Sequence, residues 1–208
     1  MHTLANTLRF GCRLADAKGA LILIHGRGAS ADDIAGLTDA FDAPEFAFLA
    51  PSARDGVWFP QRFFAPVEKN EPGLSSALLT VESLVKEITM AGISRQRIGI
   101  IGFSQGACLA LEHTARAGVR YGFTAGLSGA LIGPLGAPRQ ASNLQGMPVL
   151  VACAEADPHF ALPFVEASAT LLEGMNATLT KQIYPGNAHT VFPQEITWIN
   201  QQLTELRA

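Results

Sequence analysis

The serine in the segment Gly102-Phe103-Ser104-Gln105-Gly106 is the first candidate for chemistry in this chain. The segment follows an apolar run, 97–101, and precedes a helical stretch rich in small residues, 107–117. A strand, a sharp turn and a helix in this order form a nucleophile elbow, in which glycines on both sides of the serine avoid collisions with the adjoining backbone. The pattern predicts that Ser104 presents its hydroxyl above the end of a sheet as a nucleophile.

The base that would take the proton of Ser104 is expected to be His189. After an elbow of this kind, the acid and then the histidine follow the serine in the sequence. His189 lies in a loop between the last predicted strand and the last predicted helix, and loops at the carboxyl ends of parallel strands gather catalytic groups. The order excludes His2 and His25. His113 lies inside the helix after the elbow, and His159 competes only weakly.

The acid that would orient His189 is expected to be Asp157. It falls just beyond the predicted strand 149–154 and is followed by Pro158, which restricts the turn. Glu155 is the main rival. Asp157 is favoured because it is farther past the strand end and so reaches the imidazole more easily while its loop stays packed. Either carboxylate could instead serve only to make local turn hydrogen bonds.

Two backbone N–H groups are needed to hold the negative charge that develops on an attacked carbonyl oxygen. The first expected donor is the N–H of Gln105, directly after the nucleophile at the start of a helix. The second is the N–H of Arg27, in the glycine-flanked loop 25–28 after an early strand. The Arg27 side chain either reaches only solvent or meets an anionic substrate group.

Two other motifs have less support. Residues 26–31 fit a dinucleotide-binding fingerprint, but no acidic residue ends the following strand, 46–50, to bind a ribose. Ser128 lies in Gly126-Leu127-Ser128-Gly129, which resembles a second elbow, but no clear helix follows it. Ser128 is therefore expected to pack at the end of the sheet.

Short apolar segments alternate with amphipathic ones along the whole chain. Several predicted strands are apolar without alternation, as expected for strands covered on both faces. This order predicts one α/β domain spanning residues 1–208, with a mainly parallel sheet and helices on both faces. The expected strands are 8–14, 21–25, 46–50, 98–103, 123–128, 149–154 and 178–184, and the expected helices are 32–41, 76–91, 105–117, 163–173 and 194–206.

The segment 54–73 has no convincing period and is long for a connection in a compact domain, which favours a functional role. It concentrates four aromatic residues, each of which could instead cover the core beneath a long loop. As a group they are expected to wall a substrate pocket: Trp58, Phe59, Phe63 and Phe64.

The bulk composition excludes several classes of protein. The net charge of −3, with both signs scattered, gives no basic footprint for nucleic acid, and no apolar block is long enough to span a membrane. The three cysteines, Cys12, Cys108 and Cys153, show no spacing for zinc or a redox pair, and the N-terminus lacks the regions of a signal peptide. We therefore expect a cytoplasmic protein without a metal site.

Taken together, these motifs resemble the phospholipase/carboxylesterase family of α/β-hydrolases, which includes acyl-protein thioesterases and small bacterial esterases. The similarity extends over nearly the whole chain, from the 25–28 loop through the elbow to the approach to His189. It implies a lidless, cofactor-free serine hydrolase with the triad Ser104, Asp157 and His189. The sequence departs from the family where Pro60 follows Trp58-Phe59, at Asn187-Ala188, and at Cys153-Ala154 before the acid.

The expected function is hydrolysis of small to medium acyl or aryl carboxylic esters through an acyl-enzyme. The departures weaken any transfer of thioesterase or lysophospholipase specificity, which remain alternatives. A non-catalytic binding protein on the same fold is disfavoured because all three triad roles are filled, and a dienelactone-type hydrolase because it would place a cysteine at the elbow. The expected partner is a small-molecule ester. The sequence does not determine the oligomeric state, and a homodimer is one of the states open to it.

Overall fold

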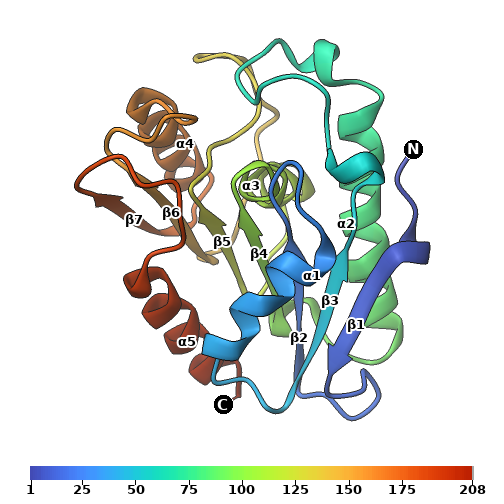
Figure 1. Ribbon diagram of the computed structural model, residues 1–208. Helices are drawn as coiled ribbons and strands as arrows, with labels where there is room; N and C mark the ends of the chain where they lie inside the picture. The colour runs from blue at the N-terminus through green and yellow to red at the C-terminus, as the bar shows by residue number, and fades with distance from the viewer. Residues whose placement is uncertain (208) are drawn as a thin grey trace.

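Seven strands form one sheet in the order β1-β3-β2-β4-β5-β6-β7 (Figure 1). The computed structural model describes residues 1–207. Only β1 runs antiparallel to its neighbour, and every other pairing is parallel, so the predicted mainly parallel α/β architecture is confirmed. The strands are β1 (Thr7–Gly11), β2 (Gly19–Ile24), β3 (Phe46–Pro51), β4 (Ile98–Phe103), β5 (Phe123–Leu127), β6 (Pro148–Ala154) and β7 (Thr178–Tyr184).

Helices cover both faces of the sheet. Because successive strand residues point to opposite faces, a strand such as β2 contributes side chains to both cores. In β2, Ile22 and Ile24 join the core under α2 (Gly73–Met90), α3 (Gln105–Ala117) and α4 (Leu162–Gly174). Leu21 and Leu23 join the core under α1 (Ala31–Ala35) and α5 (Pro193–Arg207). This double cover explains why the strands read as continuous apolar runs.

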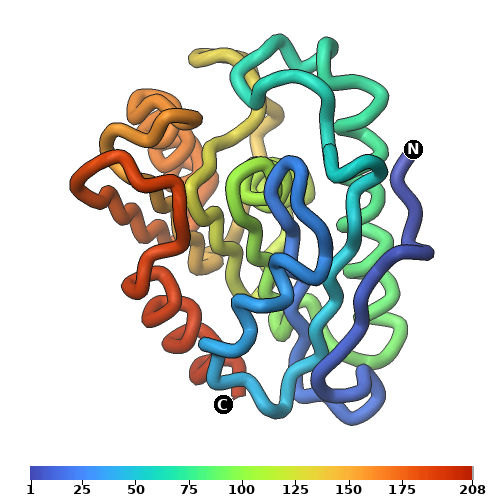
Figure 2. The backbone as a smooth tube through the Cα atoms, viewed as in Figure 1, coloured from blue at the N-terminus to red at the C-terminus, as the bar shows by residue number. Residues whose placement is uncertain are grey.

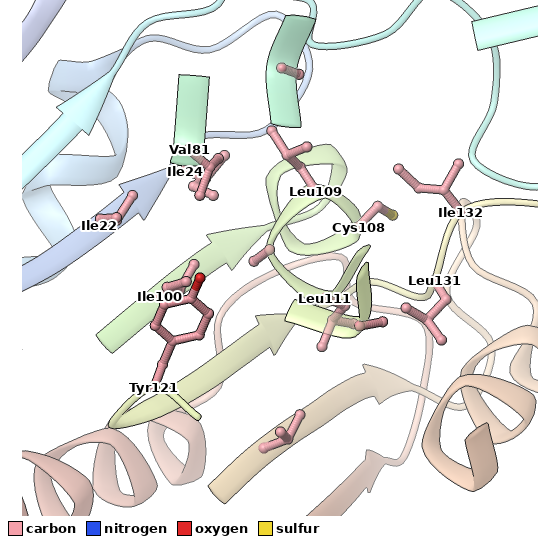
Figure 3. Close-up of a cluster of buried hydrophobic side chains, with 14 of the residues drawn as sticks. Ile22, Ile24, Val81, Ile100, Cys108, Leu109, Leu111, Tyr121, Leu131 and Ile132 are labelled. Atoms are coloured by element: carbon pink, nitrogen blue, oxygen red, sulfur yellow. The ribbon is translucent and has the colours of Figure 1, made fainter. Parts of the chain in front are cut away.

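The larger core packs side chains of β2, β4, α2 and α3 against one another (Figure 3). Ile24 of β2, Ile100 of β4, Val81 of α2 and Leu109 of α3 are all fully buried in this cluster. Since well-packed interiors resist displacement, the carboxyl end of β4 and the first turn of α3 have a firm base.

Two predicted elements are shorter than expected. The first strand was predicted to reach residue 14, but β1 ends at Gly11, whose φ of +74° no longer fits a strand. The helix predicted over 32–41 is a single short helix, α1, followed by a 3-10 segment, Gly36–Ala40. A capping box is present at the start of α1, since Ser30 and Asp33 exchange hydrogen bonds.

The long connection after β3 contains two 3-10 turns, Arg54–Gly56 and Val67–Asn70, and α2 then begins at Gly73, three residues earlier than predicted. In Figure 2 this segment lies beside the connection after β5, and the N–H of Gly133 donates to the carbonyl of Phe63. The segment therefore forms part of the surface at the carboxyl ends of the strands. Among residues 1–207, no helix is both long and apolar enough to cross a membrane.

Candidate active site

Ser104 lies on a strained turn between β4 and α3, as the elbow motif predicts. Its φ of 55° and ψ of −117° are unusual for a residue with a side chain. A Cβ added at Gly102 would lie 2.1 Å from the carbonyl oxygen of Gly106, and one at Gly106 would lie 2.1 Å from the carbonyl oxygen of Ile24. Only glycine fits at both places, and the tight turn presents the serine hydroxyl at the end of the sheet.

The structure brings the three predicted triad residues together. His189 Nε2 lies 2.9 Å from Ser104 Oγ, and His189 Nδ1 lies 2.8 Å from Asp157 Oδ2. The Asp157 side chain is fully buried, whereas that of His189 keeps 18% of its exposure. This geometry allows the serine hydroxyl to donate to Nε2 while Nδ1–H donates to the carboxylate.

Backbone donors fix the Asp157 carboxylate from behind. Its Oδ1 accepts the N–H of His159 at 2.8 Å and that of Phe160 at 3.2 Å, which leaves Oδ2 for His189. The rival acid, Glu155, instead accepts the N–H of Gly186 at 3.2 Å and so closes the loop between β7 and α5. The preference for Asp157 agrees with this arrangement.

Three rings surround the imidazole of His189. Phe103 and Phe160 lie with ring centroids 5.0 and 5.9 Å away, and His159 meets it edge-on at 4.7 Å. The Phe160 ring is within 17° of parallel to the imidazole. These contacts restrict the imidazole to the plane in which its two nitrogens face Ser104 and Asp157.

The remaining histidines are occupied elsewhere. His25 Nε2 accepts the N–H of Ala53 at 3.0 Å, and burial lowers the pKa of His25, which suits a neutral acceptor. Burial likewise lowers the pKa of His2, whose Nδ1 accepts the N–H of Arg54 at 3.1 Å. His113, in α3, contacts Glu82 of α2 at 3.2 Å. None of these three contacts involves the Ser104 site.

The two expected oxyanion donors both lie next to Ser104. Gln105 begins α3, where backbone N–H groups lack partners within the helix. The loop that carries Arg27 approaches so closely that a Cβ on Gly26 would lie 3.3 Å from the Ser104 Cβ. Within residues 1–207, neither the Arg27 N–H nor the Gln105 N–H has a hydrogen-bond acceptor. Both groups are available to a ligand at Ser104.

A cavity of about 430 Å³ opens at Ser104 and His189. Its walls include four phenylalanine rings: Phe59, Phe63, Phe103 and Phe160. Phe63 and Phe160 stack with centroids 4.6 Å apart, which joins the connection after β3 to the loop of Asp157. The sequence identified Phe59 and Phe63 as pocket residues but missed Phe103 and Phe160. Phe103 lies within the elbow motif itself, and Phe160 lies three residues after the acid, which are the signals that could have located them.

Two of the four predicted pocket residues do not line this cavity. Trp58 is fully buried, and its Nε1–H donates to the carbonyl of His25 at 2.9 Å, so its ring is fixed to the start of the loop 25–28. Phe64 is 37% exposed and packs against Phe63 and Phe164 on the outer side. Neither residue therefore lines the cavity at Ser104, because the direction of each ring depends on tertiary partners.

Ser128 is buried at the end of β5 and contacts the loop of His189. Its φ of 51° places it just after β5, and its Oγ donates to the carbonyl of Thr190 at 3.1 Å. Ser128 thereby ties the end of the sheet to the residue after His189. The expectation of sheet-end packing agrees with this fully buried position.

The cysteines form no disulfide. Burial raises the pKa of Cys108 and of Cys153 to about 12, so neither is a thiolate near neutral pH. Within residues 1–207, no group of three or more His, Cys, Asp or Glu side chains is placed to hold a metal ion.

A Ser-His-Asp relay at the carboxyl ends of a mainly parallel sheet, with the serine on a strand-turn-helix elbow, defines the class of α/β-hydrolases. Residues 11–206 match the family model described as Phospholipase/Carboxylesterase. The chain therefore belongs to the phospholipase/carboxylesterase family of carboxylic ester hydrolases, and the resemblance noted in the sequence is confirmed.

Solved structures show the same relationship. A phospholipase/carboxylesterase from Dyadobacter fermentans is 37% identical, with 98% of each chain covered and a TM-score of 0.92. The Bacillus cereus carboxylesterase is 20% identical over 96% of this chain and 93% of its own, with a TM-score of 0.71. Zea mays acyl-protein thioesterase 2 is 19% identical over 97% and 99%, with a TM-score of 0.73. At these lower identities the last two similarities concern the fold alone.

Proposed function

We propose that this protein is a serine carboxylesterase that cleaves small to medium acyl or aryl esters at Ser104. The observation that carries the proposal is the continuous relay from Ser104 Oγ to His189 Nε2 at 2.9 Å and from His189 Nδ1 to Asp157 Oδ2 at 2.8 Å. Hydrogen-bonded contact between nucleophile, base and orienting acid is what acyl transfer by an activated serine requires.

In the proposed reaction, Ser104 Oγ attacks the ester carbonyl while His189 Nε2 takes its proton. The N–H groups of Arg27 and Gln105 stabilise the oxyanion, and Asp157 stabilises the imidazolium. His189 then returns the proton to the departing alcohol, which leaves an acyl-Ser104 ester. Water, deprotonated by His189, hydrolyses this ester and restores the free serine.

The cavity supports esters whose acyl or aryl part is apolar. Phe59, Phe63 and Phe160 supply apolar surface, and the volume of about 430 Å³ lies within the usual range for small-molecule sites. We further propose that the chain folds as a single domain and works in the cytoplasm. The three unpaired cysteines support a reducing compartment. Light scattering of the purified protein would distinguish a monomer from a homodimer.

The test is turnover of p-nitrophenyl esters from acetate to palmitate, with a matched thioester, by the wild-type protein and by Ser104→Ala. We expect wild-type hydrolysis that falls about 10⁴-fold or more in the variant, with an unchanged fold, because triad members act as a unit. Labelling by a fluorophosphonate should disappear in the same variant. Turnover by Ser104→Ala near the wild-type rate would exclude Ser104 as nucleophile, and ligand binding without any turnover would indicate a binding protein.

A further inference from the structure

The wall of the cavity at Phe59 is held by the side chain of Gln105. Gln105 Oε1 accepts the backbone N–H of Trp58 at 2.9 Å, and its Nε2 donates to the carbonyl of Phe59 at 2.8 Å. Gln105 is only 5% exposed, and Phe59 only 2%. One side chain thus joins the first residue of α3 to the backbone that carries a cavity ring.

The side chain of Arg27 holds the same segment from the opposite loop. Its Nη2 lies 2.7, 3.2 and 3.0 Å from the carbonyl oxygens of Phe59, Pro60 and Gln61, respectively. Among residues 1–207, no carboxylate lies within ion-pair distance of Arg27. The charge of Arg27 is therefore directed at a cluster of backbone carbonyls, which sets the path of residues 59–61.

Asn70 fastens the far end of this segment. It is fully buried, its Oδ1 accepts the N–H of Gln61 at 2.8 Å, and its Nδ2 donates to the carbonyl of Arg62 at 3.4 Å. The next ring after this point, Phe63, also lines the cavity. Side chains from three separate parts of the chain therefore hold residues 58–62 in one conformation.

We propose that the side chains of Arg27 and Gln105, assisted by Asn70, are positioning residues that determine which acyl groups the cavity accepts. The inference rests on the proposed esterase function. The two residues whose N–H groups would face the oxyanion use their side chains to fix the wall that contacts the acyl chain. A long acyl chain contacts Phe59 and Phe63, whereas an acetyl group remains close to Ser104, so disturbing this wall penalises long chains selectively.

The test compares Arg27→Met with wild type on p-nitrophenyl acetate and octanoate. We expect kcat/KM for octanoate to fall about tenfold more than that for acetate, chiefly through a higher KM, because uniform binding is lost while the transition-state groups remain. Arg27→Lys restores a donor to the carbonyl cluster and should recover part of the octanoate activity. Asn70→Ala should change selectivity in the same direction without altering the oxyanion loop.

The matched control is Arg120→Met, which removes another arginine that donates to a backbone carbonyl, that of Gln145, at 2.6 Å. It should leave the ratio of octanoate to acetate activity unchanged. Equal losses on both esters in Arg27→Met and Asn70→Ala, or losses that follow only the fall in Tm, would overturn the positioning role. Failure of the esterase proposal has a different signature, since turnover would then be absent or insensitive to Ser104→Ala.

Discussion

Replacing Gly106 with alanine tests the close packing that creates the elbow. The added Cβ would lie 2.1 Å from the carbonyl oxygen of Ile24 and 2.6 Å from that of His25. Cβ atoms essentially never lie closer than 3.0 Å to another heavy atom of this kind. Starting from 2.1 Å, α3 and β2 must therefore move apart by about 0.9 Å. Both obstacles are backbone atoms, which cannot rotate away.

We expect Gly106→Ala to lower the free energy of unfolding by about 3 kcal/mol, the upper part of the range for overpacked cores. For a chain of this length that corresponds to a fall in Tm of roughly 6–12 °C. The same shift moves the Gln105 N–H relative to Ser104, so kcat should fall as well. Thermal unfolding by circular dichroism and p-nitrophenyl acetate turnover measure the two effects.

Gly36→Ala is the matched control. Gly36 has φ −58° and ψ −21°, and an added Cβ would meet nothing within 4 Å. This substitution should stabilise the protein by about 0.4–1 kcal/mol, because alanine restricts the unfolded chain. The reasoning fails if Gly106→Ala unfolds within 2 °C of wild type, a margin of roughly 1 kcal/mol or less, and retains full activity.

Three further predictions concern the acid, a buried carboxyl group and the walls of the cavity. Asp157→Asn should keep its backbone hydrogen bonds but favour the wrong imidazole tautomer, with a loss of about 10⁴-fold in kcat; a loss below tenfold would contradict the role of Asp157. Burial raises the pKa of Glu195 from 4.5 to about 8, so the folded state retains a proton that the unfolded chain releases in that interval. The contribution of Glu195 to stability is therefore complete below pH 4.5 and is lost towards pH 8, by at most about 5 kcal/mol; Glu195→Gln should flatten the fall in stability that urea unfolding measures across pH 5–8, and an unchanged slope would refute it. Trp58→Phe should lower Tm without altering chain-length preference, whereas Phe63→Ala should shift preference towards shorter esters, because a long acyl chain loses a wall that it contacts; the opposite pattern in a p-nitrophenyl ester series would place Trp58 in the pocket.

The hydrogen-bonded arrangement of Ser104, His189 and Asp157 could be predicted from the sequence because its constraints are local and ordered. The glycines around Ser104 specify the turn, and the positions of Asp157 and His189 just past strand ends bring them to the same edge of the sheet. The parallel sheet followed from apolar runs such as that of β2, whose residues are buried on both faces. These features require no knowledge of how distant side chains meet.

The pocket could not be predicted to the same degree, because each ring direction is decided by residues far away in the sequence. Trp58 turns inwards since its Nε1–H finds the carbonyl of His25, and Phe63 turns towards the site since Phe160 stacks on it. Phe64, its neighbour, then points outwards. A cluster of aromatic residues in a loop therefore indicates a pocket nearby, but not which rings form it.

Several residues of the site have two functional groups that contact different parts of it. Asp157 orients His189 with Oδ2, while its Oδ1 accepts two backbone N–H groups and thereby fixes Phe160, whose ring stacks on the same imidazole. Gln105 likewise holds the cavity wall with its side-chain amide, while its backbone N–H is the group that we propose stabilises the oxyanion. Because each such residue couples two parts of the site, substitutions at Asp157 and Gln105 should show non-additive effects with substitutions at Phe160 and Phe59, respectively.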